Sequence, residues 1–394
     1  MSDYVFIISL LPLGIWLKLV LGQGGFWRER PDDRQGVWAP ERVWPSVVAV
    51  VPARNEADVI ATSIGSLLAQ TYPGPFEIIL VDDQSTDGTA EIARGLVKPP
   101  DNRLHIIGGS PLPAGWVGKI WAVAQGVGAA RHRHPDGTYL WLTDADIGHE
   151  PDNLLMLVTR AENGHLDLVT QMVRLDPSSL GENFLSPAFV YFFAMLYPFT
   201  WVNTRQHKMA AAAGGSMLVR QDALIRSGGI EGIRQELIDD CALARQIKSL
   251  SAPSGGIHLS LTDKARSLRS YGGFFGVGRM VARSAYTQLS YQPLALVGTV
   301  LGLAITFMLP LVLVLAGGPA AVPALITYGL MVLSFGPILE VYRLSPLYAL
   351  TLPLVAIAYM GFTLKSALDH WRGRGGRWKG RVQASANNID ESSL

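Results

Sequence analysis

The chain has 394 residues, of which 49% are hydrophobic and only 16% are charged. Because ordinary soluble domains are about one quarter charged, this composition excludes a disordered chain, a coiled coil and a highly charged nucleic-acid-binding protein. A formal net charge of +1 also gives no electrostatic reason to expect a nucleic-acid partner. The single cysteine, Cys241, excludes an intrachain disulfide and a cysteine-rich zinc site. The charges are distributed unevenly, which indicates a membrane protein with a soluble body.

Residues 1–22 predict an N-terminal transmembrane anchor. Asp3 stands where a cleaved signal peptide has basic residues, and no small-residue cleavage site follows the apolar stretch. Arg28, Arg30 and Arg34 come soon after it. By the positive-inside rule these arginines place the next domain in the cytosol. We therefore expect a multi-pass protein of the inner (cytoplasmic) membrane with a cytosolic body.

Residues 46–283 predict one soluble α/β domain. Short apolar runs alternate with stretches of helical spacing in its first hundred residues, and the runs end in polar residues. Such runs indicate the strands of a parallel sheet that is buried on both faces. The expected strands are residues 46–51, 76–81, 104–107 and 139–142, and the expected helices are residues 57–70, 88–97 and 119–130. Ligands of such sheets bind beyond the carboxyl ends of the strands, where this sequence has its acidic residues.

Polar motifs follow three of these strands. They are Pro52-Ala53-Arg54-Asn55-Glu56, Asp82-Asp83-Gln84-Ser85-Thr86-Asp87-Gly88-Thr89 and Asp144-Ala145-Asp146. Each alone fits a turn or a helix N-cap equally well. Together they bring several carboxylates to one edge of the sheet, where Mg²⁺ or Mn²⁺ bridging a diphosphate would offset their repulsion. The sequence has no Gly-x-x-x-x-Gly-Lys-Ser/Thr motif and no Gly-x-Gly-x-x-Gly after the first strand, which disfavours a P-loop and a dinucleotide dehydrogenase.

In order and spacing, residues 46 to about 285 resemble the inverting family 2 glycosyltransferases of GT-A fold. The resemblance rests on these motifs and on the later acidic pair Asp239-Asp240. A closer similarity is to the hopanoid-associated (hopene-associated) membrane glycosyltransferases, which are related to ceramide glucosyltransferase-like enzymes. It rests on Pro113-Ala114-Gly115-Trp116-Val117-Gly118-Lys119-Ile120-Trp121-Ala122, on Arg279-Met280-Val281-Ala282-Arg283 and on Trp378-Lys379-Gly380-Arg381.

The resemblance implies a role for each matching residue. Asp144 and Asp146 would bind the divalent cation, with Asp146 as the more direct ligand, and Asp240 beside Asp239 would be the catalytic base. The residues expected to bind the nucleotide sugar are Pro52, Arg54, Glu56, Asp82, Asp83, Lys119, Asp144, Gly215, Ser216, Arg279 and Arg283. Taken alone, Asp240 fits a helix-start carboxylate that the helix dipole favours better than it fits a base, and only its company with the other motifs favours catalysis.

One feature separates this chain from the family's polymerising members. Those enzymes carry a Gln-x-x-Arg-Trp element, whereas here Arg283 is followed by Ser284, so transfer of a single sugar is expected. Arg279 and Arg283 lie one helical turn apart and could reach a diphosphate together. Arg266 and Arg269 are interpreted as interfacial charges.

Residues 184–202 form an uncharged, aromatic-rich stretch of 19 residues inside the soluble domain. If this stretch crossed the membrane, Asp146 and Asp240 would lie on opposite sides of the bilayer, which a shared site forbids. An interfacial helix that guides a lipid towards the site and a buried core helix both fit the pattern.

Residues 294–365 predict a C-terminal transmembrane region. The stretch from Ser284 to Leu339 has 56 residues without a charged side chain, which as helix would measure roughly 84 Å. A bilayer core is only about 30 Å thick, so the region must contain several segments. The expected segments are residues 294–316, 320–339 and 344–364, followed by a tail over residues 366–394 that is first basic and then disordered. Three crossings would put this basic tail outside, so the segment 320–339, which prolines and glycines interrupt, is the candidate for a re-entrant turn.

The sequence thus predicts a membrane-bound inverting glycosyltransferase that uses a nucleotide sugar, expected to be UDP-linked, and a divalent cation. Its expected acceptor is a lipid, in hopanoid or related glycolipid biosynthesis, and no nucleic acid is involved. Two alternatives remain open at this point. One is transfer to a polyprenyl phosphate, which needs a basic cluster at the membrane entrance, and the other is a catalytically silent lipid-binding or transport protein.

Overall fold

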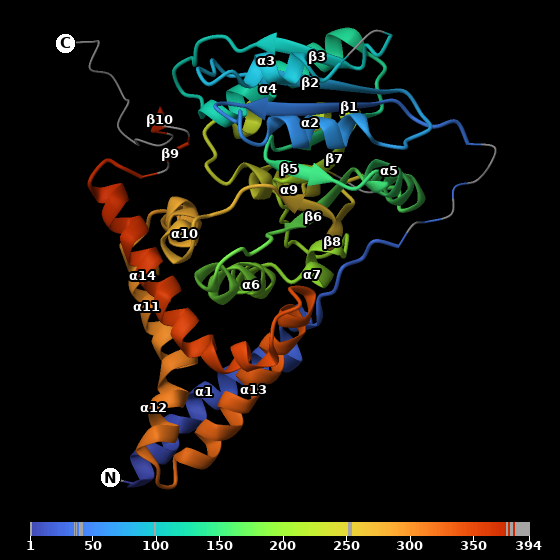
Figure 1. Cartoon of the computed structure of the whole chain (residues 1–394). Coiled ribbons are helices and arrows are strands. Elements are labelled where there is room, and N and C mark those ends of the chain that lie inside the picture. The colour runs from blue at the N-terminus through green and yellow to red at the C-terminus, as the bar shows by residue number, and fades with distance from the viewer. Residues whose placement is uncertain are drawn as a thin grey trace.

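The computed structural model describes residues 2–34, 36, 38, 42–97, 100–250, 254–375, 377–378 and 381–382. A body of mixed strands and helices stands on a set of long apolar helices (Figure 1). Short 3₁₀ turns at Phe26–Arg28 and Glu231–Ile233 and a two-stranded pair, β9 (Arg377–Trp378) with β10 (Arg381–Val382), complete the elements that are not described below. The disorder predicted for the end of the tail falls on residues outside the described ranges.

An eight-stranded sheet forms the centre of the body. Its spatial order is β3-β2-β1-β4-β7-β6-β8-β5. The strands are β1 (Val47–Ala53), β2 (Phe76–Asp82), β3 (Leu104–Gly108), β4 (Tyr139–Thr143), β5 (Ile147–His149), β6 (Leu168–Arg174), β7 (Ser216–Arg220) and β8 (Ile257–Ser267). The four strands that the sequence predicts run parallel, which confirms the expected α/β class. The other half of the sheet is mixed, because β7 runs antiparallel to β4 and β6, and β5 runs antiparallel to β8.

Helices cover both faces of this sheet (Figure 1). They are α2 (Ile60–Leu68), α3 (Thr89–Arg94), α4 (Gly118–Arg133), α5 (Asn153–Asn163), α6 (Leu180–Leu196), α7 (Phe199–Asn203), α8 (Gln221–Arg226), α9 (Asp239–Lys248) and α10 (Phe274–Gln288). The central strands are solidly apolar because alternate side chains enter two different cores. In β1, Val48 and Val50 pack into the core that contains α4, and Ala49 and Val51 pack into the core that contains α2.

Four helices among the described residues are long and apolar enough to cross a membrane. The first is α1 (Ser2–Gly22). The second is the continuous run Pro293–Ala316, made of α11 (Pro293–Leu303), a π-helical turn (Ala304–Met308) and α12 (Leu309–Ala316). The third is α13 (Ala321–Val341), and the fourth is Pro346–Trp371, a 3₁₀ turn (Pro346–Thr351) continued by α14 (Leu352–Trp371). The helix α13 passes through Pro337 without a break, although its sequence predicts an interruption.

Three of these helices pack against one another below the body, namely α1, the α11–α12 run and α13 (Figure 1). The Trp16 indole of α1 donates a hydrogen bond to the Thr306 carbonyl oxygen at 2.8 Å. Just beyond the end of α1, Arg30 forms an ion pair with Glu340 near the end of α13, at 2.7 Å. The C-terminal ends of α1 and α13 therefore lie together on the side of the body.

The fourth helix, α14, packs mainly on α10, and it also contacts α6, α11 and the π-helical turn Ala304–Met308. Its Tyr359 hydroxyl donates to the Leu185 carbonyl oxygen of α6 at 2.9 Å. Near its C-terminal end, His370 stacks on Tyr291, which lies in the connection between α10 and α11, with 4.3 Å between ring centroids. Since α14 also starts just after the body-side end of α13, both of its ends lie on the side of the body (Figure 1).

Candidate active site

The site begins where β4 ends and β7 starts. Thr143 at the end of β4 pairs with Ser216 at the start of the antiparallel β7. The Thr143 hydroxyl also donates to the Gly215 carbonyl oxygen at 2.8 Å. This pairing brings Asp144, which follows β4, to the same edge of the sheet as Gly214 and Gly215, which precede β7.

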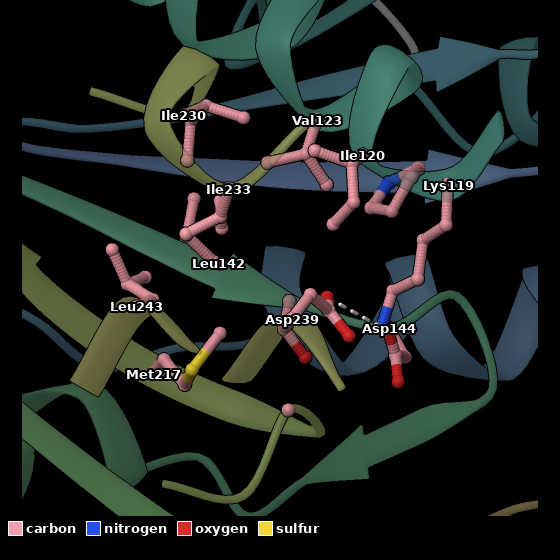
Figure 2. Close-up of a pocket in the computed structure, with 13 residues that line it drawn as sticks. Lys119, Ile120, Val123, Leu142, Asp144, Met217, Ile230, Ile233, Asp239 and Leu243 are labelled. Atoms are coloured by element: carbon pink, nitrogen blue, oxygen red, sulfur yellow. Dashed lines mark ion pairs between the residues drawn. The ribbon is translucent and has the colours of Figure 1, made fainter. Parts of the chain in front are cut away.

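Lys119 links this edge to the acidic pair of α9. Its ammonium nitrogen lies 2.8 Å from Asp144 Oδ1 and 3.6 Å from Asp239 Oδ2 (Figure 2). Burial disfavours the charge on Lys119, but the two carboxylates outweigh burial and raise the pKa of the ammonium above its usual value. Lys119 therefore stays charged and holds together carboxylates that are 95 residues apart in the sequence.

Asp146 has a different cationic partner. Arg269, which follows β8, donates from Nε to Asp146 Oδ2 at 2.9 Å and also forms an ion pair with the buried carboxylate of Glu56. The interpretation of Arg269 as an interfacial charge is therefore wrong. Arg266, by contrast, is exposed on β8. No sequence signal marked Arg269, because β8 was not predicted and 123 residues separate it from Asp146.

Asp240 lies in the first turn of α9, beside Gly214. Its Oδ2 accepts a hydrogen bond from the Gly214 amide at 2.9 Å, and its Oδ1 accepts one from the Cys241 amide at 2.7 Å. A Cβ added at Gly214 would lie 3.4 Å from Asp240 Oδ2 and 3.6 Å from Lys119 Nζ. Burial, together with the charge of Asp239, raises the pKa of Asp240 to about 6. A carboxylate with this pKa can accept a proton near neutral pH.

A pocket with one polar end and one apolar end lies at the centre of the site (Figure 2). Its polar end is formed by Lys119, Asp144 and Asp239. Its apolar lining comes from Ile120, Val123, Leu142, Met217, Ile230, Ile233 and Leu243. These side chains surround the ionisable groups with a medium of low polarity, and burial of this kind raises the pKa of Asp144 as well.

The ends of β1 and β2 form the border of the site. Pro52 lines the pocket. Arg54 donates to the Asp83 carbonyl oxygen and lies 3.6 Å from the Asp83 carboxylate. Asp83 is fully buried, so its carboxylate supports Arg54, which corrects the expectation that it binds the nucleotide. Asp82 is half-buried, and its Oδ1 accepts a hydrogen bond from the Ser85 amide at 3.2 Å.

Ser216 has a structural position rather than a binding one. Its hydroxyl is fully buried, accepts from the Trp141 indole at 3.1 Å and donates to Gln171 at 3.0 Å. This corrects the expectation that its side chain contacts the donor. Gly215 is required by packing, because a Cβ there would lie 2.9 Å from Val173 Cγ1.

The two arginines of α10 lie differently with respect to the site. Both Arg279 and Arg283 are exposed. Arg283 is close enough for its charge to oppose that of Lys119 electrostatically. Its charge also acts on the Tyr271 hydroxyl in the segment between β8 and α10. The structure therefore brings Arg283 towards the site and shows no such approach for Arg279 among the contacts of the described residues.

The oxygen atoms of Asp144 and Asp146 are of the chemical type that Mg²⁺ and Mn²⁺ prefer. Over the described residues, no group of three or more His, Cys, Asp or Glu side chains converges to hold a metal ion. The two aspartates therefore fit a divalent cation that takes its remaining ligands from a bound diphosphate and from water. They do not fit a resident ion that the protein encloses by itself.

Comparisons with known proteins agree with this geometry. Residues 48–228 match the family described as "Glycosyl transferase family 2". The succinoglycan biosynthesis protein ExoO of Rhizobium meliloti is 33% identical over 141 residues, which are 34% of this chain and 36% of that protein. The beta-monoglucosyldiacylglycerol synthase of Nostoc sp. is 29% identical over 186 residues, 47% of this chain and 38% of that enzyme. The chain thus spans little more than a third of the length of these two relatives.

A solved structure shares the fold over nearly the whole chain. The mannosyltransferase PcManGT from Pyrobaculum calidifontis, solved with GDP-Man and Mn²⁺, superposes with a TM-score of 0.56 at 19% sequence identity. The likeness covers 91% of this chain and 99% of that one. The strand order and the acidic motifs at the strand ends agree with the family match, and the body of the chain has the GT-A fold of a glycosyltransferase.

Proposed function

We propose that this chain is a membrane-bound inverting glycosyltransferase that transfers one sugar from a nucleotide sugar, UDP-linked, to a hydroxyl group of a lipid. The observation that carries the proposal is the position of Asp240. This carboxylate has a pKa of about 6. It lies between Lys119, with its partners Asp144 and Asp239, and the helices α6 and α10, which pack on α14. The resemblance of the sequence adds hopanoid or a related glycolipid as the acceptor class.

Tyr197 supports the placement of Asp240 towards the helices that pack on α14. Tyr197 follows the last turn of α6, and burial together with the nearby carboxylate of Asp240 raises the pKa of its hydroxyl. Gln288, the last residue of α10, donates a hydrogen bond to the same hydroxyl. Asp240, the proposed base, therefore lies next to the contact between α6 and α10. Both of these helices pack on the apolar helix α14.

The proposed reaction is a single in-line displacement. Asp240 accepts the proton of the acceptor hydroxyl while that oxygen attacks C1 of the sugar, and the bond from C1 to the diphosphate oxygen breaks with inversion at C1. Lys119 and the nearby charge of Arg283 offset the negative charge of the leaving nucleoside diphosphate. A divalent ion held by Asp144 and Asp146 would supply Lewis-acid stabilisation of the same diphosphate. The name of the Nostoc relative, a glucosyldiacylglycerol synthase, supports a lipid acceptor.

The packing of the four apolar helices supports a definite topology. In this proposal α1, the α11–α12 run and α13 cross the inner membrane, while α14 starts and ends on the side of the body. Arg28, Arg30 and Arg34, which follow α1, and Arg372 and Arg374, which follow α14, then lie on one side, as the positive-inside rule requires. The apolar segment that does not cross the membrane is therefore α14, and not residues 320–339 as the sequence suggests. The body is cytosolic, and α6 lies in the interface between it and the bilayer.

Reporter fusions test this topology. A reporter inserted after Gly256 and a second one after Gly375 should both behave as cytosolic, and a third one at Gly318 should behave as periplasmic. A periplasmic signal at Gly256 would overturn the orientation and the proposed substrate side. A periplasmic signal at Gly375 alone would show that α14 crosses.

The transfer reaction is tested with purified protein, radiolabelled UDP-sugars, Mn²⁺ and a total lipid extract. Lipid-linked label that survives mild acid is expected, because a glycoside of a neutral lipid is stable whereas a sugar on polyprenyl phosphate is released. Acid-labile label would replace the proposed acceptor by a polyprenyl phosphate. If folded protein neither binds UDP with Mn²⁺ nor transfers label, a lipid-binding or transport role would replace the enzymatic one.

A further inference from the structure

Each aspartate of the Asp144-x-Asp146 motif already has a cation from its own chain. Asp144 pairs with Lys119 at 2.8 Å, and Asp146 pairs with Arg269 at 2.9 Å. Arg269 also contacts Glu56, a carboxylate that is only 6% exposed. A divalent cation on Asp146 would therefore stand beside a guanidinium that occupies the same carboxylate oxygen.

The Arg269 side chain can leave Asp146 while its backbone stays in place. The Leu268 amide donates to the Asp146 carbonyl oxygen at 2.8 Å, which anchors the segment beside the motif. On the other side of Arg269, the Gly273 amide donates to Glu182 of α6 at 2.9 Å. The Arg269 side chain is 31% exposed, so solvent can reach it. For Arg269 to exchange Asp146 for another partner, its side chain must rotate, but the backbone between Leu268 and Gly273 need not move.

We propose that Arg269 is a built-in counter-ion that occupies Asp146 before the divalent cation binds and gives up this carboxylate when the cation arrives together with a nucleoside diphosphate. The inference rests on the proposed function, because it takes a nucleoside diphosphate as the ligand that accompanies the ion. The cation and the guanidinium repel each other, so metal alone binds weakly. A diphosphate offers the displaced guanidinium a pair of anionic oxygens, which it can bind with two parallel hydrogen bonds. Metal and nucleotide binding are therefore coupled through one arginine.

The consequence differs from that of a static salt bridge. If Arg269 only stabilised the fold, its removal would leave the metal affinity of the folded protein unchanged or would lower it through disorder of Asp146. If Arg269 competes with the cation, its removal raises the affinity for metal alone and lowers the advantage that UDP confers. The two roles therefore predict opposite signs for one measured quantity.

The experiment measures Mn²⁺ binding to the full-length, detergent-solubilised protein by electron paramagnetic resonance, with and without UDP. For the unaltered protein, UDP should tighten Mn²⁺ binding at least tenfold. Arg269→Gln should tighten binding of Mn²⁺ alone at least tenfold and reduce the further gain from UDP. Arg266→Gln is the matched control, because Arg266 is exposed on β8 and forms no ion pair with Asp144 or Asp146 among the contacts of the described residues, and it should change neither value.

Two further variants keep the test decisive. Arg269→Lys retains the charge without the planar fork and should tighten binding of Mn²⁺ alone by about threefold, so it serves if the glutamine variant does not fold. Adding Asp146→Asn to Arg269→Gln should abolish the tighter binding of Mn²⁺ that Arg269→Gln alone produces. This result would assign the bound ion to the Asp146 carboxylate. Unchanged or weaker binding of Mn²⁺ alone in folded Arg269→Gln or Arg269→Lys overturns the proposal. If UDP has no effect in any variant but Arg269→Gln still tightens binding of Mn²⁺, the proposed nucleotide-sugar function fails while the competition between Arg269 and metal stands.

Discussion

Two acidic pairs meet at one site, and their surroundings differ. Asp144 and Asp146 follow a buried strand, and each pairs with a cationic side chain. Asp239 and Asp240 begin a helix, and Asp240 is held by two backbone amides and forms no ion pair among the residues that the structure describes. Ion pairing favours the charged form of a carboxylate and burial favours its protonated form, and beside Asp239 burial raises the pKa of Asp240 to about 6. The same side chain therefore suits cation binding in the first pair and proton transfer in the second.

The first and largest expected effect tests the helix-start pair. Asp240→Asn keeps the size of the side chain but cannot accept a proton, so we expect transfer to fall by at least about 100-fold, in line with the 10²–10⁴ that general-base assistance contributes. The measurement is single-turnover transfer of labelled sugar, with thermal unfolding as the check on folding.

The neighbouring Asp239→Asn is the control for this variant. Asp239 lies 3.6 Å from Lys119 and not against Gly214, so its loss should reduce transfer by less than about tenfold. A dead Asp239→Asn with a fully active Asp240→Asn would move the base by one residue. Full activity in both variants would mean that this acidic pair does not activate the acceptor.

The pH dependence of transfer should report the same carboxylate. Because the pKa of Asp240 is raised to about 6 and the charged form is the base, kcat/KM should fall tenfold per pH unit below about pH 6 and be level above it. Asp239→Asn removes a neighbouring negative charge, so the falling limb should shift to lower pH. A limb that stays in place in Asp239→Asn, or a flat profile from pH 5 to pH 7, would contradict the assignment.

The smallest effects concern the two glycines between the acidic pairs. A Cβ at Gly214 would meet Asp240 and Lys119 at ordinary contact distances of 3.4–3.6 Å, so Gly214→Ala should change the free energy of unfolding by less than about 1 kcal/mol. A Cβ at Gly215 would lie 2.9 Å from Val173, so Gly215→Ala should destabilise the fold by about 1–3 kcal/mol. Denaturant unfolding of both variants checks this difference. Equal stabilities would show that Val173 moves aside freely.

The sequence predicts the parallel half of the fold well. Its strands β1, β2 and β4 are apolar runs that are almost wholly buried, and each polar motif directly follows one of them, so the local pattern determines their position. The roles of single residues within these motifs are not determined locally. Asp83 and Ser216 are fully buried because of partners on other elements, namely Arg54 and Gln171, and their types alone do not reveal this.

The antiparallel half and the membrane side were harder to predict because their contacts are distant in sequence. Arg269 reaches Asp146 only because β8 pairs with β5, and a three-residue strand such as β5 leaves almost no pattern. The course of α14 depends on its packing against α6 and α10. Hydropathy measures length and apolarity, and these are the same for a helix that crosses a bilayer and for one that returns along the body.

Binding measurements on two variants in parallel test most directly whether one acidic pair binds the cation and the other transfers the proton. Calorimetric titration of UDP in the presence of Mn²⁺ should show that Asp146→Asn loses the Mn²⁺-dependent part of binding. In the same titration Asp240→Asn should bind UDP within about threefold of the unaltered protein. Equal losses in the two folded variants, or a loss in Asp240→Asn alone, would contradict the account.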